Sequence, residues 1–373
     1  MTYIPGLKGV IAAETKLSSV DGEAGELVIA GYPLEQIAEH ASFEEILYLL
    51  WHHELPAESV LSEFINGLKT HRTLSNTSLH VLRDAANKKL PVIDALRMAV
   101  ATLPSDNDQA DAQSLVAILP TIVATYCRLL KGEDPIAPHP DLDHAANILY
   151  MLTGQIPDDA HTHALNTYLN TIADHGMNAS TFTARVITST RSDIISAITG
   201  AIGALKGPLH GGAPGPVLAM LEEIGEPKNA EPILRAKLDA GERLMGFGHA
   251  IYRVRDPRAD VLSRTTQTFF ASNNEFYTLA MHVEQTALDL LNEYKPGRRL
   301  QTNVEFYTAL LLHGLGLHPD LFNPMFAIGR VAGWTAHCIE QRTLDRIIRP
   351  ESVYSGDKNG QWIPLEKRSL AAV

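Results

Sequence analysis

The chain has 373 residues, two cysteines and a formal net charge of −12. This length can bury a large core and predicts two or more domains, while the acidic balance argues against nucleic acids and anionic membranes as partners. The first eight residues lack a basic region followed by an apolar one, so no signal peptide is expected. Cys127 and Cys338 lie in apolar stretches and are predicted to be free thiols of a cytoplasmic protein.

A small β hairpin is predicted near the N-terminus, and the rest of the chain is predicted to be helical. Short apolar stretches flank a turn signal at Asp21-Gly22, which is typical of a hairpin between residues 10 and 32. Beyond it, Ser42 and Glu45 form a capping box ahead of an apolar helix face. Further helices are predicted over residues 57–69, 78–88, 92–103, 115–130, 144–152 and 160–172. The sequence therefore predicts an all-α protein of enzyme size.

The segment Lys206-Gly-Pro-Leu-His210-Gly-Gly-Ala-Pro214 interrupts the helices. A helix is predicted before it, over residues 192–205, with Gly207 as a left-handed cap, and another follows over residues 214–225. His210 is thus predicted to lie just before a helix N-terminus, where partial positive charge disfavours imidazolium. A neutral imidazole there can donate a hydrogen bond to a carbonyl that is becoming an enolate. The alternative is a histidine in an ordinary Gly/Pro linker.

The second half of the sequence is predicted to contain a smaller domain. Residues 222–242 are charged and broken by loop signals, and a basic link, Lys295-Pro-Gly-Arg-Arg299, precedes the return of strongly apolar helices. Helical segments are predicted over residues 264–294, 303–315 and 324–341. We therefore predict a small domain over residues 213–313, set between the two parts of a large helical domain, residues 1–212 and 314–373.

A glycine-rich segment, Gly246-Phe-Gly248-His249, is followed by arginines at positions 253, 255 and 258. The glycines let a ligand approach the backbone, and arginine forks match carboxylates and phosphates in geometry. We therefore favour a substrate site here over a solvated basic loop. His175 is predicted to lie at another helix start, with a capping or core histidine as the alternative.

Two charged side chains are predicted within apolar helices. Glu305 lies in a first helical turn, where the helix dipole favours a carboxylate and partial burial can tune its pKa toward that of a base. The alternative is an ordinary glutamate at a helix N-terminus. Arg330 shares a helix face with Phe326 and Trp334, so its charge needs an anionic partner, either a protein carboxylate or a ligand carboxylate.

Neutral histidines, one carboxylate and several arginines suit a particular task. The carboxylate removes a proton from a weak carbon acid, a histidine stabilises the enolate oxygen, and arginines hold a highly anionic carbonyl compound to which the enolate adds. This interpretation requires no metal and no cofactor. A rival from another class is a metal-dependent hydrolase built on His139, Asp141, Asp143 and His144, although these residues lie in a Pro-rich loop without a family pattern.

Several of these motifs resemble those of citrate synthases. The resemblance is carried by Gly207-Pro-Leu-His210-Gly-Gly-Ala, by Gly246-Phe-Gly-His249 through Asp256-Pro-Arg258, and by Asn303-Val-Glu305-Phe-Tyr. The opening segment 6–15 and the closing segment 349–356 extend it to the shorter bacterial and archaeal members, which include 2-methylcitrate synthases. The resemblance implies a mostly α-helical homodimer that condenses acetyl-CoA with oxaloacetate and hydrolyses the thioester to citrate and coenzyme A.

The same resemblance implies roles for individual residues. His210 stabilises the acetyl-CoA enol, His249 polarises the oxaloacetate carbonyl, and Glu305 stands at the position of the catalytic base. Oxaloacetate binding is implied for His175, His249, Arg258 and Arg330, and for Arg349 across the dimer interface. Coenzyme A binding is implied for Gly246, Gly248 and Arg253, and the basic link adds Lys295 and Arg298.

The sequence departs from the family pattern at two positions. Glu305 stands where relatives usually have aspartate, and the extra methylene moves the carboxylate by roughly an ångström, enough to lower a rate on the order of a hundredfold. Ala30 precedes Gly31-Tyr32 where relatives often have arginine. The alternatives are a 2-methylcitrate synthase using propionyl-CoA, since one methylene gives only about 1–3 kcal/mol of discrimination, and a catalytically weakened paralogue.

Overall fold

The computed structural model describes residues 3–210, 214–249, 251–270 and 274–368. The chain forms two compact units, one of residues 15–347 and one made of both chain ends, residues 1–14 with 348–373. The described part of the terminal unit contains two short 3-10 turns, Pro5–Leu7 and Leu365–Lys367. The sheet and the α-helices belong to the larger unit, which therefore holds the candidate site.

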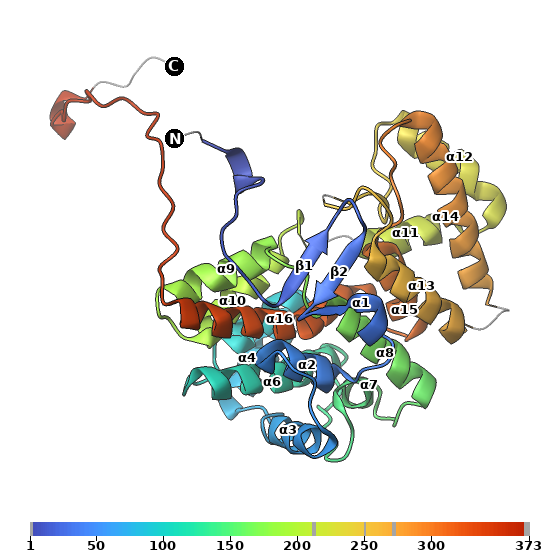
Figure 1. The fold of residues 1–373 in the computed structure, drawn as a ribbon, viewed down its shortest axis with the longest axis horizontal. Coiled ribbons are helices and arrows are strands. Elements are labelled where there is room, and N and C mark those ends of the chain that lie inside the picture. The colour runs from blue at the N-terminus through green and yellow to red at the C-terminus, as the bar shows by residue number, and fades with distance from the viewer. Residues whose placement is uncertain (1–2, 211–213, 250, 271–273, 369–373) are drawn as a thin grey trace. The chain divides into compact units, whose positions relative to one another are not determined.

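Helices dominate the larger unit, which confirms the predicted all-α class (Figure 1). In chain order they are α1 (Leu34–Ile37), α2 (Phe43–His52), α3 (Glu58–Thr70), α4 (Asn76–Asn87), α5 (Val92–Val100), α6 (Asp108–Leu130), α7 (His144–Thr153), α8 (Asp159–Ile172), α9 (Ala179–Ser189), α10 (Ile194–Leu205), α11 (Pro214–Ile224), α12 (Ala230–Asp239), α13 (Pro257–Phe270), α14 (Glu275–Tyr294), α15 (Val304–Gly314) and α16 (Phe322–Leu344).

The predicted hairpin is present as strands β1 (Ser18–Asp21) and β2 (Glu26–Ile29), and the two-residue strand β3 (Tyr32–Pro33) completes an antiparallel sheet in the order β1-β2-β3. Asp21 closes the hairpin, because its carbonyl accepts from the Gly25 N–H at 2.9 Å. Its Oδ1 accepts from two further backbone amides of the turn. Gly25 has φ +73°, a left-handed conformation that favours glycine, so the tip is a tight turn of small residues.

Helix α16 runs through the centre of the larger unit. Helices α9 and α10 pack along one side of it and α2 and α6 along the other (Figure 1). Its buried polar residues are Arg330, Thr335, His337 and Gln341. The Gly333 N–H donates to the Ala173 carbonyl at 3.0 Å, and a Cβ at Gly333 would collide with Ala173 and Asp174. This close approach places α16 against the end of α8, next to His175.

One predicted helix start is confirmed and another is wrong. The Ser42–Glu45 capping box is formed at the start of α2. Helix α6 begins at Asp108 rather than at Leu115, because the Asn107 side chain caps it by accepting from a backbone amide. Among the described helices, α6 is long and apolar enough by composition to cross a membrane, but most of it is buried against other helices. The helix predicted over residues 115–130 is therefore part of a helix of the core, and both cysteines are free thiols as predicted.

The predicted left-handed cap at Gly207 is wrong. Helix α10 ends at Leu205, and Gly207 does not adopt a positive φ. Instead, its N–H donates to the Ala204 carbonyl at 3.2 Å, which tightens the last turn without a left-handed residue. The helix predicted to follow is α11, and Gly211 and Gly212 of the intervening segment, whose lack of side chains would let a ligand approach the backbone, lie outside the described residues.

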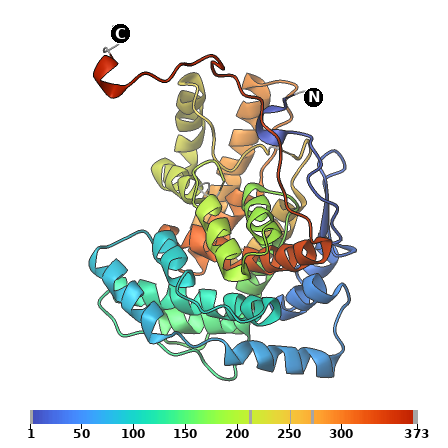
Figure 2. The same ribbon diagram turned by 90° about the vertical axis from the view of Figure 1, so that its left-hand side faces the viewer.

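Helices α11, α12 and α14 gather at one end of the larger unit, and helices α2 to α6 lie at the other end (Figures 1 and 2). Helix α12 packs on α14, and both α11 and α13 pack on α15. These elements fall within residues 213–313, the predicted small domain. Because the chain divides into compact units only at its termini, the boundaries of that domain stay a prediction.

Candidate functional site

Two predicted site histidines from distant parts of the chain face each other. His175 lies in the turn between α8 and α9, His249 lies in the loop before α13, and their ring centroids are 5.7 Å apart. Tyr252 joins them, because its hydroxyl lies 3.0 Å from His175 Nε2 and its ring centroid lies 4.8 Å from that of His249. Burial, together with the charges of Arg258 and Arg330, holds the pKa of His175 well below its usual range. His175 is therefore neutral at physiological pH.

The hydrogen bonds of His249 determine which ring nitrogen carries its proton. The backbone N–H groups of Ile251 and Tyr252 donate to Nδ1 at 3.0 and 3.2 Å. Burial lowers the pKa of His249 to about 4, and Arg258 adds to this effect, so the ring holds one proton at neutral pH. Since Nδ1 accepts, the proton lies on Nε2, only 3.2 Å from Arg258 Nη2. Two adjacent donors without an acceptor between them suit a ligand carbonyl or carboxylate oxygen.

Arg258 is held in place by Asp256. The guanidinium Nε and Nη2 donate to the two carboxylate oxygens at 3.0 and 2.8 Å, and the Arg258 backbone N–H adds a third bond at 3.0 Å. Both side chains are buried. A two-point contact of this kind fixes the orientation of the planar guanidinium. Arg258 is therefore a preoriented cation beside His249.

Arg330 is a second buried guanidinium, and its hydrogen bonding is incomplete. Its Nε donates to the Ile172 carbonyl at 2.6 Å, its Cζ lies 4.7 Å from the Phe326 ring centroid, and its Nη2 has no hydrogen-bond partner among the described residues. Burial lowers the pKa of Arg330 to about 10 and the charge of Asp174 opposes this effect, so the group stays charged at neutral pH. A buried guanidinium nitrogen without a partner is costly. An anionic ligand would satisfy it.

His210 is oriented by a serine and a tryptophan. Ser180 Oγ lies 2.8 Å from His210 Nε2, donates to Asn178 Oδ1 at 2.7 Å and accepts from Trp334 Nε1 at 3.1 Å. The Ser180 backbone N–H also points to His210 Nε2, at 3.3 Å. Burial lowers the pKa of His210 and the charge of Arg330 adds to this, so the imidazole is neutral as predicted. Because Ser180 contacts His210 at Nε2, Nδ1 is the ring nitrogen that is available to a ligand.

Glu305 lies in the first turn of α15, where the N-cap residue Asn303 accepts from the Glu305 N–H at 3.0 Å. Its carboxylate makes no hydrogen bond to the described part of the chain. Burial raises the pKa of Glu305 to about 7, although Arg258 and Arg330 act in the opposite direction. A carboxyl group with a pKa near the working pH is suited to general-base catalysis. The charges of both arginines act on Glu305, which places it in the same site.

Hydrogen bonds between the glycine-rich segment and residues 301–303 bring Glu305 to this site. The Gly248 N–H donates to the Gln301 carbonyl at 2.7 Å, and Asn303 donates to the carbonyls of Gly246 and Gly248 at 2.9 and 2.8 Å. Gly246 has φ +88°, and a Cβ there would come within 3.1 Å of Phe306 on α15. Both glycines therefore join the His249 loop to the start of α15. Their predicted contact with coenzyme A stays a prediction.

A basic pocket of about 290 Å³ lies beside the His249 loop. Its charged lining residues are Arg253, Arg255, Lys295 and Arg299, and its apolar ones include Leu288, Leu291 and Leu300. The structure thus brings together two residues predicted to bind coenzyme A, Arg253 and Lys295. Arg299 lines this pocket, whereas the predicted Arg298 does not. A larger pocket of about 800 Å³ between α5 and α10 contains none of the predicted site residues.

The remaining predicted residues lie elsewhere. Arg349 belongs to the terminal unit, and its role across a dimer interface stays a prediction. The described residues contain no group of three or more His, Cys, Asp or Glu side chains placed to hold a metal ion, which leaves the rival hydrolase without a metal site there. His144 is buried against Phe43, and Asp143 caps α7. Burial lowers the pKa of His144 to about 3.

Sequence reasoning gave no role to Ser180, Tyr252 or Asp256, although Tyr252 and Asp256 stand inside the motif from Gly246 to Arg258. Ser180 contacts His210 from 30 residues away, and Tyr252 contacts His175 from 77 residues away. Only the Asp256 contact is local, two residues from Arg258. Of these three roles, only that of Asp256 had a sequence signal: the Asp-Pro-Arg spacing lets the carboxylate bond to the guanidinium two residues away.

Comparisons with known proteins agree with this geometry. A family model described as "Citrate synthase, C-terminal domain" matches residues 6–351. A citrate synthase of Haloferax volcanii is 39% identical over 380 residues, covering 97% of this chain and 98% of its own. A 2-methylcitrate synthase of Mycobacterium tuberculosis is also 39% identical, over 359 residues, covering 94% of this chain and 90% of its own.

The fold is also similar to that of solved structures. Citrate synthase from Thermoplasma acidophilum, in a ternary complex with carboxymethyl coenzyme A and oxaloacetate, matches with a TM-score of 0.88. The two chains are 29% identical, and the match covers 97% of this chain and 98% of the other. The similarity therefore extends over nearly the full length of both chains.

Proposed function

The chain belongs to the citrate synthase family, and we propose that it condenses acetyl-CoA with oxaloacetate and hydrolyses the thioester product to citrate and coenzyme A. The observation that carries the proposal is the position of Glu305. Burial raises the pKa of this carboxyl group to about 7, the charges of two buried arginines act on it, and one of them, Arg258, is held beside the neutral His249. Carbon-acid chemistry on an anionic substrate needs this combination of a base and cations.

In the first step, the Glu305 carboxylate removes a proton from the methyl group of acetyl-CoA. The electron pair of the broken C–H bond moves into the thioester, and the carbonyl oxygen becomes an enol or enolate oxygen. Neutral His210 donates a hydrogen bond to this oxygen through Nδ1, because Ser180 holds its Nε2. A neutral donor suits a weakly acidic enol, and the low pKa of His210 keeps it neutral.

In the second step, the enol carbon attacks the ketone carbon of oxaloacetate, a carbon–carbon bond forms, and the ketone oxygen becomes a hydroxyl. His249 donates from Nε2 to that oxygen as negative charge develops there. Arg258 and Arg330 pair with the substrate carboxylates, and the unpartnered Nη2 of Arg330 gains an acceptor. Water then attacks the thioester carbonyl, and the coenzyme A thiolate leaves.

Coenzyme A is proposed to bind with its phosphates near the basic pocket. Arg253, Lys295 and Arg299 line this pocket together with leucine side chains. Cations at this spacing suit phosphate groups. No resident cofactor is expected, since coenzyme A enters as the thioester substrate.

We also propose that the protein is a cytoplasmic homodimer and that it serves the tricarboxylic acid cycle. Arg349 is proposed to reach the partner subunit's site from the C-terminal segment, in which Val353, Tyr354 and Trp362 are exposed. Apolar side chains exposed on a terminal segment are commonly covered by a second protein surface. The acidic net charge of −12 supports neither nucleic acid nor an anionic membrane as a partner.

The second candidate is 2-methylcitrate synthase, favoured by the relative from M. tuberculosis at the same identity as the citrate synthase from H. volcanii. The deciding experiment is release of free thiol by the purified protein with oxaloacetate, comparing acetyl-CoA with propionyl-CoA. We expect turnover with acetyl-CoA at the higher kcat/KM. A marked preference for propionyl-CoA would assign 2-methylcitrate synthase activity and leave the steps above unchanged. Oxaloacetate binding without thiol release from either donor would indicate a catalytically weakened paralogue.

A further inference from the structure

The β1–β2 hairpin contacts both loops that carry the proposed oxaloacetate-binding histidines, although it contains none of the catalytic residues. At its base, Ser18 Oγ donates to Asp174 Oδ2 at 2.5 Å and accepts from the Gly176 N–H at 2.9 Å. These two partners flank His175 in sequence. A single hydroxyl on β1 therefore holds the turn on both sides of this histidine.

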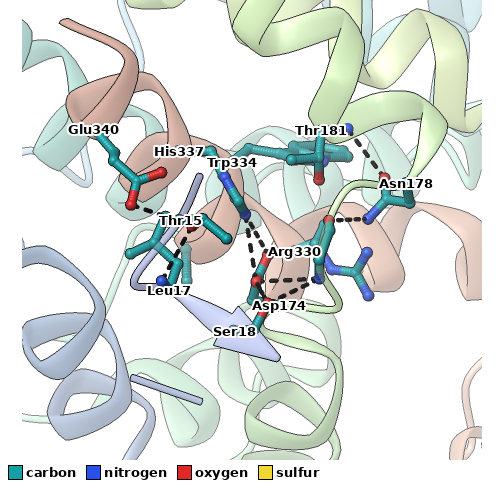
Figure 3. Close-up of polar contacts among 12 residues, drawn as sticks. Thr15, Leu17, Ser18, Asp174, Asn178, Thr181, Arg330, Trp334, His337 and Glu340 are labelled. Atoms are coloured by element: carbon teal, nitrogen blue, oxygen red, sulfur yellow. Dashed lines mark hydrogen bonds and ion pairs between the residues drawn. The ribbon is translucent and has the colours of Figure 1, made fainter. Parts of the chain in front are cut away.

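Asp174 is itself held by a chain of polar groups that includes His337 and Glu340 on α16, both shown in Figure 3, and Arg185 on α9. Arg185 Nη1 donates to His337 Nδ1 at 2.9 Å and to Glu340 Oε2 at 2.6 Å. Because His337 Nδ1 accepts, its proton lies on Nε2, which faces Asp174 Oδ1 at 3.3 Å. Glu340 also accepts from the Thr15 hydroxyl at 3.1 Å. The segment leading into β1 is thus anchored to α16 at Glu340 and, through Asp174, at His337.

At its other end, the hairpin tip lies against residues 251–255, which follow His249. The Arg253 N–H donates to the Gly22 carbonyl at 2.8 Å. A Cβ on Gly22 would lie 2.8 Å from the Ile251 carbonyl carbon and 2.9 Å from its Cγ2, distances too short for real contacts. The N–H groups of Ile251 and Tyr252 donate to His249 Nδ1 and so orient its ring. The hairpin tip therefore packs directly against the backbone that orients His249.

We propose that the β1–β2 hairpin is a brace that sets the spacing between His175 and His249, with Ser18 and Gly22 as positioning residues for oxaloacetate. The proposal rests on the proposed function. The hairpin is rigid enough for this task, because it is anchored through Ser18 at one end and closed by the Asp21 turn at the other. The Ser18 end of the hairpin makes no hydrogen bond to His210, Glu305 or the basic pocket, whereas the tip also contacts Arg253, which lines that pocket, and β2 packs on α1 and α13. Loss of the Ser18 hydroxyl should therefore affect oxaloacetate and leave acetyl-CoA largely unaffected.

The test uses Ser18→Ala and Gly22→Ala in the full-length protein. Both variants should raise the KM for oxaloacetate. Ser18→Ala should raise it by about tenfold, the effect of losing one hydrogen bond to a charged group, and keep the KM for acetyl-CoA within about twofold. Gly22→Ala should also lower kcat, because it displaces the two amides that hold His249. Ser18→Thr keeps the hydroxyl and should restore the KM for oxaloacetate to near the wild-type value, which a general loss of stability would not do.

Matched controls are available on α3. Ser62 is exposed and bonds only within its helix, and a Cβ on Gly67 would meet nothing within 4 Å. Ser62→Ala and Gly67→Ala should leave both KM values unchanged. Thermal unfolding of every variant shows whether it is folded, and if Gly22→Ala fails to fold, Ser18→Ala and Ser18→Thr decide the question.

A direct measurement of oxaloacetate binding distinguishes a failure of the brace proposal from a failure of the proposed function. Calorimetric titration with oxaloacetate alone should give about tenfold weaker affinity for Ser18→Ala than for the wild type. If the wild type binds oxaloacetate and turns over neither acyl-CoA, the proposed function fails while this ratio still tests the brace. An unchanged oxaloacetate affinity and KM in folded Ser18→Ala, or equal increases in both substrates' KM values, would overturn the brace and leave the proposed function intact.

Discussion

Ser180 Oγ lies between His210 Nε2 at 2.8 Å and Trp334 Nε1 at 3.1 Å. Through this one hydroxyl, a histidine at the end of a Gly/Pro segment is tied to the central helix α16. Lys206, Pro208 and Leu209 in the preceding segment are exposed, and Leu209 next to His210 is fully exposed. The orientation of His210 therefore depends on α9 and α16 rather than on its own loop.

Replacing Ser180 with alanine should lower kcat by on the order of tenfold to a hundredfold, because the imidazole loses the group that aims it at the enol oxygen. The KM for oxaloacetate should change by less than about twofold, since the serine does not contact the groups proposed to bind it. Steady-state thiol release gives both parameters. Thr183→Val removes a half-buried hydroxyl of the same helix that donates to the Ala179 carbonyl of its own helix, and it should be silent. Equal losses in the two variants would contradict a specific role for Ser180.

Replacing Glu305 with glutamine should abolish thiol release, a loss of at least about a thousandfold, because an amide cannot accept the proton of the acetyl methyl group. Oxaloacetate binding should survive, since glutamine matches the glutamate in size. Calorimetry and the thiol assay measure the two properties. Glu275→Gln alters an exposed glutamate in the first turn of α14 and serves as the matched control. An active Glu305→Gln enzyme would remove Glu305 from the position of the base.

The same substitution should stabilise the fold at alkaline pH. Burial raises the pKa of Glu305 from 4.5 to about 7, so the folded state binds the proton more tightly than the unfolded state does. The stability that comes from this proton is present below about pH 4.5 and is lost as the pH rises through 7. Glutamine resembles the protonated acid and avoids this loss.

Urea unfolding of both proteins at pH 5 and pH 8 measures the difference. At pH 8, Glu305→Gln should exceed the wild type in free energy of unfolding by up to about 3 kcal/mol, whereas the gap at pH 5 should stay below about 1 kcal/mol. A gap of the same size at both pH values would mean that the carboxyl group titrates normally in the folded protein.

Two neighbouring arginines in the basic link should differ in their effect on acyl-CoA. Arg299 lines the basic pocket and Arg298 does not. Arg299→Ala should raise the KM for acetyl-CoA by about tenfold through loss of a charged contact with phosphate, and Arg298→Ala by less than about twofold. The KM for oxaloacetate should stay constant in both. A larger effect from Arg298→Ala would show that the phosphates follow a different path.

Several features could be predicted from short stretches of sequence. The Ser42–Glu45 capping box, the hairpin around Asp21-Gly22 and the start of α15 ahead of Glu305 all depend on contacts within a few residues. Such contacts follow from residue spacing, which is why they were predictable. The left-handed cap at Gly207 failed for a related reason, since a glycine permits that conformation without requiring it.

The amino-acid sequence by itself determined the helical class, the order of the elements and the residue types present at the site. Only the tertiary structure decided that Ser180 orients His210, that Arg330 Nη2 lacks a partner, and that the hairpin reaches both His175 and His249. These relationships join groups far apart in the chain, such as Arg330 and Ile172, which are 158 positions apart, and Arg253 and Gly22, which are 231 positions apart. They depend on how packed helices remove water from charged groups, and that desolvation is set by the whole fold and not by any local spacing.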